Sequence, residues 1–292
     1  MKKFSRIYIE ITNTCNLSCS FCIGNVRAPR LMGTDEFSQI LKQAKPYTNH
    51  IYLHVLGEPL MHPQLEQFLA IAHDFGMLVN ITTNGTMLGK TQDILLYAPA
   101  LRKVSISLHS MEPGSAYCTE KYLRDIAVFV TAATARRIFC ELRMWNLGAD
   151  GIDHEAMFVP LCRLLGLDQT TQETILADIC ERGNATLAPR LFLGKAARFA
   201  WPSMEEPPME QPLFCHGLRN QMAVLCDGTV VPCCLDSRGD ITLGNLFQTP
   251  LAEILSGERA LALYQGFSIR QPSEALCRRC GYAKRFSKNQ SV

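Results

Sequence analysis

The feature that most constrains this chain is a run of three cysteines near its N-terminus. Cys15, Cys19 and Cys22 are spaced C-x3-C-x2-C and follow directly after an alternating apolar stretch at 7–11. This pattern predicts a strand that ends in a tight loop able to hold a metal centre. Because a [4Fe-4S] cluster usually takes four thiolates, three cysteines predict a cluster with one iron open to a further ligand. The alternative is a zinc site that a distant histidine or cysteine completes.

Beyond the cysteine loop, strand-like and helical segments alternate at regular intervals. The predicted strands lie at 7–11, 51–55, 78–82, 104–108, 139–144 and 187–193. The predicted helices lie at 34–44, 64–75, 91–97 and 121–135, with one or two more within 153–180. This alternation predicts an α/β fold of right-handed β-α-β units with a parallel sheet. Periodicity alone fits an open doubly wound sheet as well as a partial barrel, and both place functional residues at the carboxyl ends of the strands.

A second set of cysteines follows a proline-rich stretch at 201–212, which predicts an extended linker. Beyond the linker, strands are expected at 222–225 and 229–231 around the turn residues Asp227-Gly228, with a short helix at 251–255. The cysteines of this set, spaced C-x17-C-x43-C-x2-C, are Cys215, Cys233, Cys277 and Cys280. Four thiolates can enclose a cluster with no open iron, and they also make a good zinc site.

The first cysteine loop, with Phe21 just before its last cysteine, resembles the signature loop of the radical S-adenosylmethionine (SAM) enzymes. The resemblance implies that Cys15, Cys19 and Cys22 ligate a [4Fe-4S] cluster whose open iron binds the amino and carboxylate groups of SAM. It also implies that reductive cleavage of SAM gives a 5'-deoxyadenosyl radical, which abstracts a substrate hydrogen atom. The fold implied is a partial (β/α)6 TIM-like barrel.

Motifs at the predicted strand ends resemble the SAM-binding segments of the same family. Leu-Gly-Glu-Pro at 56–59 resembles the family's Gly-Gly-Glu-Pro segment, with Leu56 in place of the first glycine. Thr-Asn-Gly at 83–85 resembles a turn that shapes the SAM pocket, and Ser107 matches the position that hydrogen-bonds the ribose. The cofactor-binding residues that the resemblance implies are Phe21, Gly57, Glu58, Thr83, Asn84, Ser107 and Arg143.

Two of the polar residues near these motifs have open interpretations. Arg143 either pairs with the SAM carboxylate or is an ordinary surface arginine, and His109 either joins the pocket or is a satisfied polar residue at a strand end. The other histidines are not expected to bind metal. His62 lies in a helix-entry segment, and His54 and His73 are expected on the surface of a strand or helix.

The C-terminal cysteines and their flanking segments resemble the SPASM extension of radical SAM enzymes, and more closely its shortened twitch form. The resemblance implies one auxiliary [4Fe-4S] cluster on Cys215, Cys233, Cys277 and Cys280. Cys233 is preferred to Cys234 because it follows Pro232, as in the family, whereas Cys234 would point to the opposite side of the strand. The chain is thus expected to divide into a radical SAM core (1–200), a linker (201–212) and a small α+β cluster-binding domain (213–292).

The remaining cysteines are expected to be reduced thiols. Cys118, Cys140, Cys162 and Cys180 lie in apolar or helical surroundings and are predicted to be core residues. Cys226 precedes the hairpin turn, where it either faces the active site or is a buried, inert thiol.

Composition limits the partners of the chain. With 29 basic and 27 acidic residues, the net charge is +2, which gives no electrostatic reason to expect a nucleic-acid partner. No segment resembles a signal peptide or is long enough to span a bilayer, so a cytoplasmic protein is expected. The sequence starts at the first strand, so a peptide substrate would have to be recognised by the barrel, the linker or a partner.

The resemblance implies a radical SAM oxidoreductase or maturase that oxidises a peptide or a small metabolite with help from the auxiliary cluster. It also implies an electron donor such as flavodoxin or ferredoxin. The alternatives are an epimerase, in which Cys226 or Cys234 donates a hydrogen atom, and an RNA-modifying enzyme. From another class, the chain would be a zinc-binding protein that touches nucleic acid through Arg278-Arg279 and Lys284-Arg285. The sequence predicts no residue that acts on the substrate.

Overall fold

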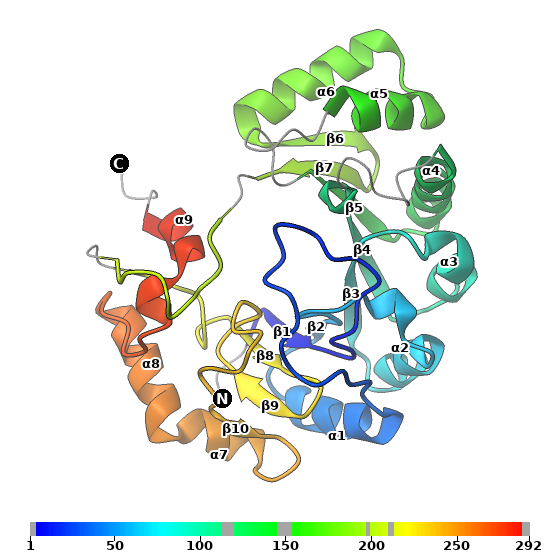
Figure 1. The fold of residues 1–292 in the computed structure, drawn as a ribbon. Helices are drawn as coiled ribbons and strands as arrows, with labels where there is room; N and C mark the ends of the chain where they lie inside the picture. The colour runs from blue at the N-terminus through cyan, green and yellow to red at the C-terminus, as the bar shows by residue number, and fades with distance from the viewer. Residues whose placement is uncertain (1–3, 112–119, 145–153, 197–198, 210–212, 288–292) are drawn as a thin grey trace.

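The computed structural model describes residues 4–111, 120–144, 154–196, 199–209 and 213–287 (Figure 1). Within them a single sheet has the linear strand order β10-β9-β8-β1-β2-β3-β4-β5-β7-β6. The strands are β1 (Arg6–Ile9), β2 (His50–Tyr52), β3 (Leu78–Thr83), β4 (Leu101–Ser107), β5 (Phe139–Met144), β6 (Asn184–Ala188), β7 (Leu191–Lys195), β8 (Gln221–Val224), β9 (Thr229–Val231) and β10 (Gly244–Asn245). The sheet is open, as in a partial TIM barrel, and the predicted fold class is confirmed.

The helices lie mainly on the outer side of this curved sheet (Figure 1). They are α1 (Thr34–Ala44), α2 (Leu65–Asp74), α3 (Leu88–Leu96), α4 (Glu120–Ala135), α5 (His154–Leu164), α6 (Gln169–Arg182), α7 (Leu251–Ser256), α8 (Glu258–Ser268) and α9 (Lys284–Ser287). Strands β1 to β5 and β7 pair in parallel, each with its neighbour in the order above. These six strands are the core of the predicted β-α-β arrangement.

Alternation along the parallel strands separates two environments. Ile7 and Ile9 on β1 are fully buried in the same hydrophobic core as Phe37, Ile40 and Leu41 of α1. Tyr8 lies between these two isoleucines in sequence and belongs to a different cluster, on the inner face of the sheet. Because successive side chains of a strand point to opposite faces, the odd-numbered residues of β1 pack toward the helices and the even-numbered ones face inward.

Two predicted strands are wrong in their extent. The strand expected at 51–55 is β2, which ends at Tyr52. The single strand expected at 187–193 is an antiparallel pair, β6 and β7, and the chain turns at Arg190 with a φ of 64°. Pro189 lies in the turn, and a proline within an apolar run disfavours a continuous central strand. β7 pairs in parallel with β5 and is therefore the sixth strand of the barrel. Helix α8, whose N-cap is Gly257, was not predicted.

The C-terminal hairpin continues the same sheet. β8 pairs in parallel with β1, and β9 pairs antiparallel with β8, as the turn at Asp227-Gly228 predicted. The sheet therefore continues across the linker predicted at 201–212. The domain boundaries given above stay a prediction. Within the described residues, no helix combines the length and the apolar character that crossing a membrane requires.

Candidate active site

The first cysteine loop connects β1 to α1 and lies at the centre of the ring of elements seen in Figure 1. Cys15 and Cys22 are exposed and Cys19 is half-buried. The backbone N–H of Leu17 donates to Cys15 Sγ, and that of Gly24 donates to Cys22 Sγ, both at 3.4 Å. Hydrogen bonds to sulfur are among the features that set the reduction potential of an iron-sulfur cluster. The loop therefore offers accessible thiols in surroundings that suit cluster ligands.

Gly57 and Glu58 hold the start of this loop. The φ of Gly57 is +75°, and a Cβ there would lie 2.3 Å from the Thr12 carbonyl oxygen, so only glycine fits. The next residue, Glu58, donates its backbone N–H to the Thr14 carbonyl at 2.9 Å. The Gly-Glu-Pro segment is thus packed against the backbone that leads into Cys15, and Leu56, the departure from the usual motif, lies outside this contact.

The Thr-Asn-Gly turn approaches the same loop from β3. Asn84 donates through Nδ2 to Asn16 Oδ1 at 2.9 Å, and the same nitrogen lies 3.9 Å from Cys15 Sγ. Thr83 Oγ1 donates to Glu58 Oε1, and the Asn84 backbone N–H donates to Glu58 Oε2, both at 2.7 Å. The structure thus brings together Cys15 and four of the predicted SAM-site residues, Gly57, Glu58, Thr83 and Asn84.

Glu58 should make the stability of the iron-free chain depend on pH. Burial raises the pKa of its carboxyl from 4.5 to about 7, although three hydrogen bonds favour the charged form. A carboxyl with a higher pKa in the folded chain stabilises the fold below about pH 4.5, and this contribution is lost as the pH rises to about 7. We expect the difference in free energy of unfolding between wild type and Glu58→Gln to change by about 2–3 kcal/mol between pH 5 and pH 8.

Urea unfolding at the two pH values measures this difference. Glu66→Gln is the matched control, because Glu66 is exposed on α2 and should show no such change. An equal change in both variants would show that Glu58 is not the group responsible.

A cavity of about 620 Å³ lies on the inner face of the sheet. Its wall includes residues of six strands, β1 to β5 and β8, and aromatic residues from the C-terminal part of the chain. The lining residues include Arg6, Tyr8, Phe21, Tyr52, His54, Lys103, Ser107, His109, Glu141, Arg143, Trp201 and Cys234. The cavity is large enough for a drug-sized ligand and combines aromatic walls with a few polar groups, as ligand sites generally do.

Three of the predicted SAM-site residues line this cavity rather than the Glu58 cluster. They are Phe21, Ser107 and Arg143. Phe21 packs on the ring of His109, with centroids 5.0 Å apart, and Trp201 Nε1 donates to the Phe21 carbonyl at 2.8 Å. His109 Nδ1 lies 2.9 Å from the Arg143 carbonyl oxygen, and burial lowers its pKa to about 4. His109 is therefore a neutral residue of the cavity wall, and Arg143 is not an ordinary surface arginine.

Several residues of the cavity were missed by sequence reasoning. His54 was expected on a surface, yet it lines the cavity, and burial lowers its pKa to about 3. Its Nδ1 is buried and has no hydrogen-bond partner among the described residues. Tyr8 and Glu141 were not singled out either. Tyr8 and Glu141 share the inward parity of Ser107, and His54 lies two residues beyond β2, but strand parity alone does not distinguish a residue that faces a cavity from one that faces solvent.

A second, smaller cavity is lined by all four C-terminal cysteines proposed as ligands, Cys215, Cys233, Cys277 and Cys280. The four thiols surround this space rather than meeting at one point. No three His, Cys, Asp or Glu side chains in the described parts of the chain lie close enough to hold one metal ion. Burial and the neighbouring thiols raise the pKa values of Cys233 and Cys277 well above 9. A positively charged group is needed to keep such thiols ionised, which fits an iron-sulfur cluster.

The neighbouring cysteines Cys233 and Cys234 face different cavities. Cys233 lines the small cavity and Cys234 the large one. Cys226 is buried and lines neither cavity. Its Sγ accepts a hydrogen bond from Arg27 Nη1 at 3.7 Å. Of the cysteines expected in the core, Cys140 and Cys162 are buried, Cys118 lies outside the described residues, and the prediction for Cys180 is wrong because it is exposed on α6.

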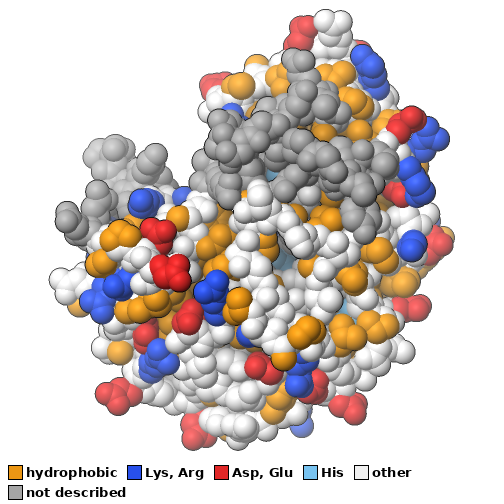
Figure 2. Space-filling model, viewed as in Figure 1, with side chains coloured by type: hydrophobic (Ala, Val, Ile, Leu, Met, Phe, Trp, Pro, Cys, Tyr) orange, Lys and Arg blue, Asp and Glu red, His pale blue; other side chains and the backbone are white. Residues whose placement is uncertain are grey.

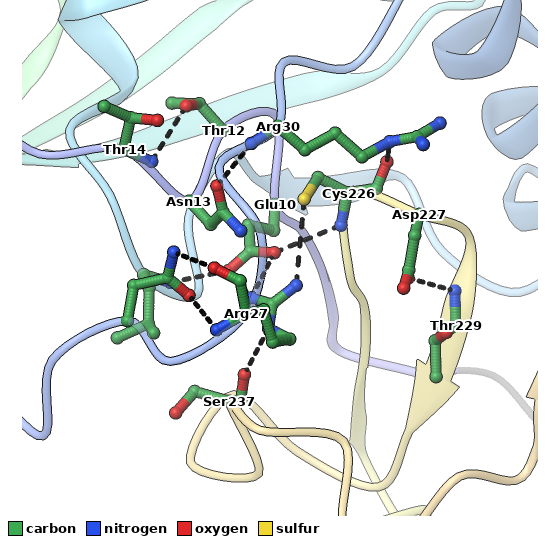
Figure 3. Close-up of polar contacts among 12 residues, drawn as sticks. Glu10, Thr12, Asn13, Thr14, Arg27, Arg30, Cys226, Asp227, Thr229 and Ser237 are labelled. Carbon is green, nitrogen blue, oxygen red and sulfur yellow. Dashed lines mark hydrogen bonds and ion pairs between the residues drawn. The ribbon is translucent and has the colours of Figure 1, made fainter.

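A buried ion pair joins the cysteine loop to the C-terminal hairpin (Figure 3). Glu10, just after β1, is fully buried, and both of its carboxylate oxygens accept from Arg27 Nη2 at 2.6 Å. The same carboxylate accepts from the backbone N–H groups of Leu56 and Cys226, each at 3.1 Å. Arg27 Nε also donates to the Ser237 carbonyl at 2.9 Å. Glu10 therefore connects the cysteine loop, the Gly-Glu-Pro segment and the hairpin before Cys233.

Family comparison agrees with this arrangement of two cysteine sites. Residues 9–138 match the model of the radical SAM superfamily. This range includes the first cysteine loop and the Gly-Glu-Pro and Thr-Asn-Gly segments. The chain belongs to the radical SAM superfamily. Residues 215–281 match SPASM, an iron-sulfur cluster-binding domain. This radical SAM protein is therefore an enzyme that uses SAM, a [4Fe-4S] cluster and an auxiliary iron-sulfur cluster, and the matches favour iron over zinc at both sites.

Curated relatives of this radical SAM enzyme have several names. Over 86 residues it is 35% identical to a tungsten-containing aldehyde ferredoxin oxidoreductase cofactor-modifying protein of Pyrococcus furiosus, a stretch that covers 28% of this chain and 24% of that protein. Over 270 residues it is 25% identical to a probable GTP 3',8-cyclase of Methanosarcina mazei, covering 80% of this chain and 78% of that protein. The match thus spans about a quarter of the length of the first of these relatives.

Solved structures support the fold of this radical SAM enzyme. SuiB of Streptococcus suis, bound to the precursor peptide SuiA, superposes with a TM-score of 0.62 at 16% identity, covering 97% of this chain and 71% of that one. BtrN in complex with AdoMet and 2-DOIA gives a TM-score of 0.56 at 17% identity, covering 100% and 96%. At these identities the likeness concerns the fold alone.

Proposed function

We propose that this chain is a radical SAM oxidoreductase that oxidises a peptide or a small metabolite held in the 620 Å³ cavity. When bound, SAM and its cluster supply a radical that takes a hydrogen atom from the substrate, and the auxiliary cluster supplies an acceptor for a second electron. A two-electron oxidation also releases a proton, which the chain must accept or pass on. We propose Cys15, Cys19 and Cys22 as ligands of the first cluster and Cys215, Cys233, Cys277 and Cys280 as ligands of the second.

The observation that carries this proposal is the position of the large cavity between the two cysteine sites. Phe21, which lies within the first cysteine loop, lines the cavity. Cys234 and Leu235, which directly follow the ligand candidate Cys233, line it as well. A substrate in the cavity would therefore touch residues that neighbour both proposed clusters in sequence.

The chain's own residues would bind and orient the reactants. Ser107 and His109 offer a hydroxyl and a neutral imidazole at the end of β4, where the SAM ribose is proposed to lie. Two lining groups, the Glu141 carboxylate and His54 Nδ1, can accept a hydrogen bond from the substrate hydroxyl or amine that is oxidised. Aromatic walls, among them Tyr8 and Trp201, exclude water from the reacting atoms.

The relatives are compatible with both substrate classes. SuiB was solved with a precursor peptide, which supports a peptide substrate. BtrN was solved with 2-DOIA, and this chain covers 96% of BtrN, which supports a small molecule. Reduced flavodoxin or ferredoxin in the cytoplasm is the proposed electron source. In the view of Figure 2, acidic and basic side chains of the described residues are interspersed, which gives no support to an RNA substrate.

Anaerobic reconstitution tests the proposal. The wild-type chain should bind about eight irons, as two four-iron clusters, and should form 5'-deoxyadenosine from SAM and dithionite. Turnover of a substrate should lower its mass by two hydrogens. A product with unchanged hydrogen content would contradict an oxidoreductase.

The auxiliary site has its own prediction. Cys277→Ala should lower the iron content from about eight to about four per chain, because one of four proposed ligands is lost. The first site is untouched, so 5'-deoxyadenosine should still form. Cys180→Ala, at an exposed position on α6, is the control and should keep about eight irons. If Cys277→Ala also keeps about eight, the proposed ligand set is wrong.

Epimerisation is the second candidate, and the position of Cys234 in the cavity favours it. There the S–H bond of Cys234 would break as a C–H bond forms on the substrate radical. The resulting thiyl radical would take one electron and one proton from the external low-potential donor and solvent. Cys226 lies away from the cavity and cannot serve this purpose.

Deuterium oxide separates the two reactions. A Cys234 thiol exchanged to S–D should leave one deuterium in an epimerised product, and Cys234→Ala should abolish that label while 5'-deoxyadenosine still forms. Cys226→Ala is the matched control and should retain the label. Mass spectrometry of the product of any substrate found by screening gives the answer, and product without deuterium excludes Cys234 as a donor.

A further inference from the structure

The charged residues of the 620 Å³ cavity are unequal in sign. Its lining includes three cationic side chains, Arg6, Lys103 and Arg143, and one carboxylate, Glu141. Lys103 Nζ lies 2.7 Å from Glu141 Oε2, and Ser105 Oγ donates to the same oxygen at 2.8 Å. The negative charge of Glu141 is therefore already matched by Lys103. The lining thus has two more cationic side chains than carboxylates.

The histidines of the lining do not change this balance. Burial lowers the pKa values of His54 and His109 to about 3 and about 4, so both rings are neutral at pH 7. The positive charge of Arg143 also lowers the pKa values of both rings. His216 lines the cavity too, and burial and then the charge of Arg6 lower its pKa. The cavity thus carries two positive charges inside a wall of aromatic rings, where charges interact more strongly than in water.

Arg6 is the arginine that bound SAM would leave available to the substrate. Its guanidinium lies 5.9 Å from the centroid of the Tyr52 ring, and Tyr8 lies on the same inner face of β1. No carboxylate of the described residues forms an ion pair with it. Arg143, at the carboxyl end of β5, is the proposed partner of the SAM carboxylate. A SAM amino group that ligates the open iron is a neutral amine, so the sulfonium and carboxylate charges of bound SAM balance and its binding leaves the cavity positive.

We propose that the substrate carries a carboxylate or phosphate group that binds Arg6 beside Tyr8 and Tyr52. This inference rests on the proposed function, which places SAM and substrate in the same cavity. Guanidinium forms paired hydrogen bonds with either anion, and the tyrosine hydroxyls of the cavity add neutral donors. Arg6 and Tyr8 share the inner face of β1, whereas the SAM-site residue Ser107 lies on β4, three strands away in the curved sheet. The anion site is thus separate from the proposed SAM site.

Calorimetric titration of the reconstituted enzyme with SAM present tests the charge preference. The probes are phenylacetate and phenyl phosphate, with neutral phenylacetamide as the matched control. We expect at least one of the two anions to bind at least about ten-fold more tightly than the amide, because hydrogen bonds between a guanidinium and an anion are stronger than those to a neutral group. The tighter anion identifies carboxylate or phosphate as the preferred group. Equal binding of all three probes would overturn the proposal, and this arm needs no variant.

A second set of titrations tests the position. Arg6→Gln should weaken binding of the preferred anion at least about ten-fold, and Arg6→Lys should restore part of it because the charge is kept. Arg136→Gln, at an exposed position after α4, is the control and should bind like wild type. If Arg143→Gln weakens the anion while Arg6→Gln does not, the assignment to Arg6 is wrong. None of these results requires SAM cleavage, so they are independent of a failure to form 5'-deoxyadenosine.

Discussion

Replacing Cys15, Cys19 and Cys22 together by alanine is expected to abolish formation of 5'-deoxyadenosine and to halve the iron content to about four per chain. The three thiols come from one loop, Cys15 and Cys22 are exposed, and the exposed backbone N–H groups of Leu17 and Gly24 can bond to water when the sulfur acceptors are lost. The substitutions should therefore remove the ligands without disturbing the fold of the loop. Mass spectrometry of SAM incubations with dithionite, together with iron analysis, measures both effects.

The variant has a matched control in the same chain. Cys180→Ala replaces an exposed thiol on α6, far in sequence from both cysteine sites, and should leave 5'-deoxyadenosine and iron unchanged. Circular dichroism of the triple variant checks that the barrel is folded. Continued SAM cleavage by a folded triple variant would refute the central assignment of this loop.

The strongest part of the sequence-based prediction is the arrangement of local motifs on a periodic scaffold. The strand at 139–144 was predicted with its observed bounds, and the turn at Asp227-Gly228 was found where expected. Both depend on patterns within a few residues. The hydrogen bonds of Glu58 with Thr83 and Asn84 were not predicted individually. The contact between the two segments follows from the strand order, because β2 and β3 are neighbours in the sheet.

The cavity was beyond sequence reasoning because its residues come from distant elements. Arg6 and Cys234 are 228 positions apart in sequence and both line it, which requires β8 to pair with β1. Nothing in the local pattern of either segment specifies that pairing. His54 was placed on a surface for a second reason: a polar residue that faces a cavity and one that faces solvent have the same strand parity.

Glu10→Leu is expected to be the most destabilising single substitution considered for this chain. The carboxylate is fully buried, and its partner Arg27 has a side chain that is only 16% exposed. Removing Glu10 leaves a guanidinium without its counter-charge and leaves the backbone N–H groups of Leu56 and Cys226 without acceptors. Breaking a buried ion pair on one side costs about 3–5 kcal/mol. At about 2–4 °C per kcal/mol, the thermal midpoint should fall by about 10 °C.

The double variant Glu10→Leu/Arg27→Met decides whether the uncompensated charge is the cause. It removes both charges, so it should be more stable than Glu10→Leu alone, and the two substitutions should not be additive. Glu120→Gln is the control for charge loss at the surface, because its partner Arg124 is exposed and such pairs contribute little, about 0.5 kcal/mol or less. A double variant less stable than Glu10→Leu would show that Arg27 holds the cysteine loop mainly through Ser237 and Cys226. In that event the loop would be joined to the hairpin by Arg27 itself, with Glu10 only an accessory acceptor.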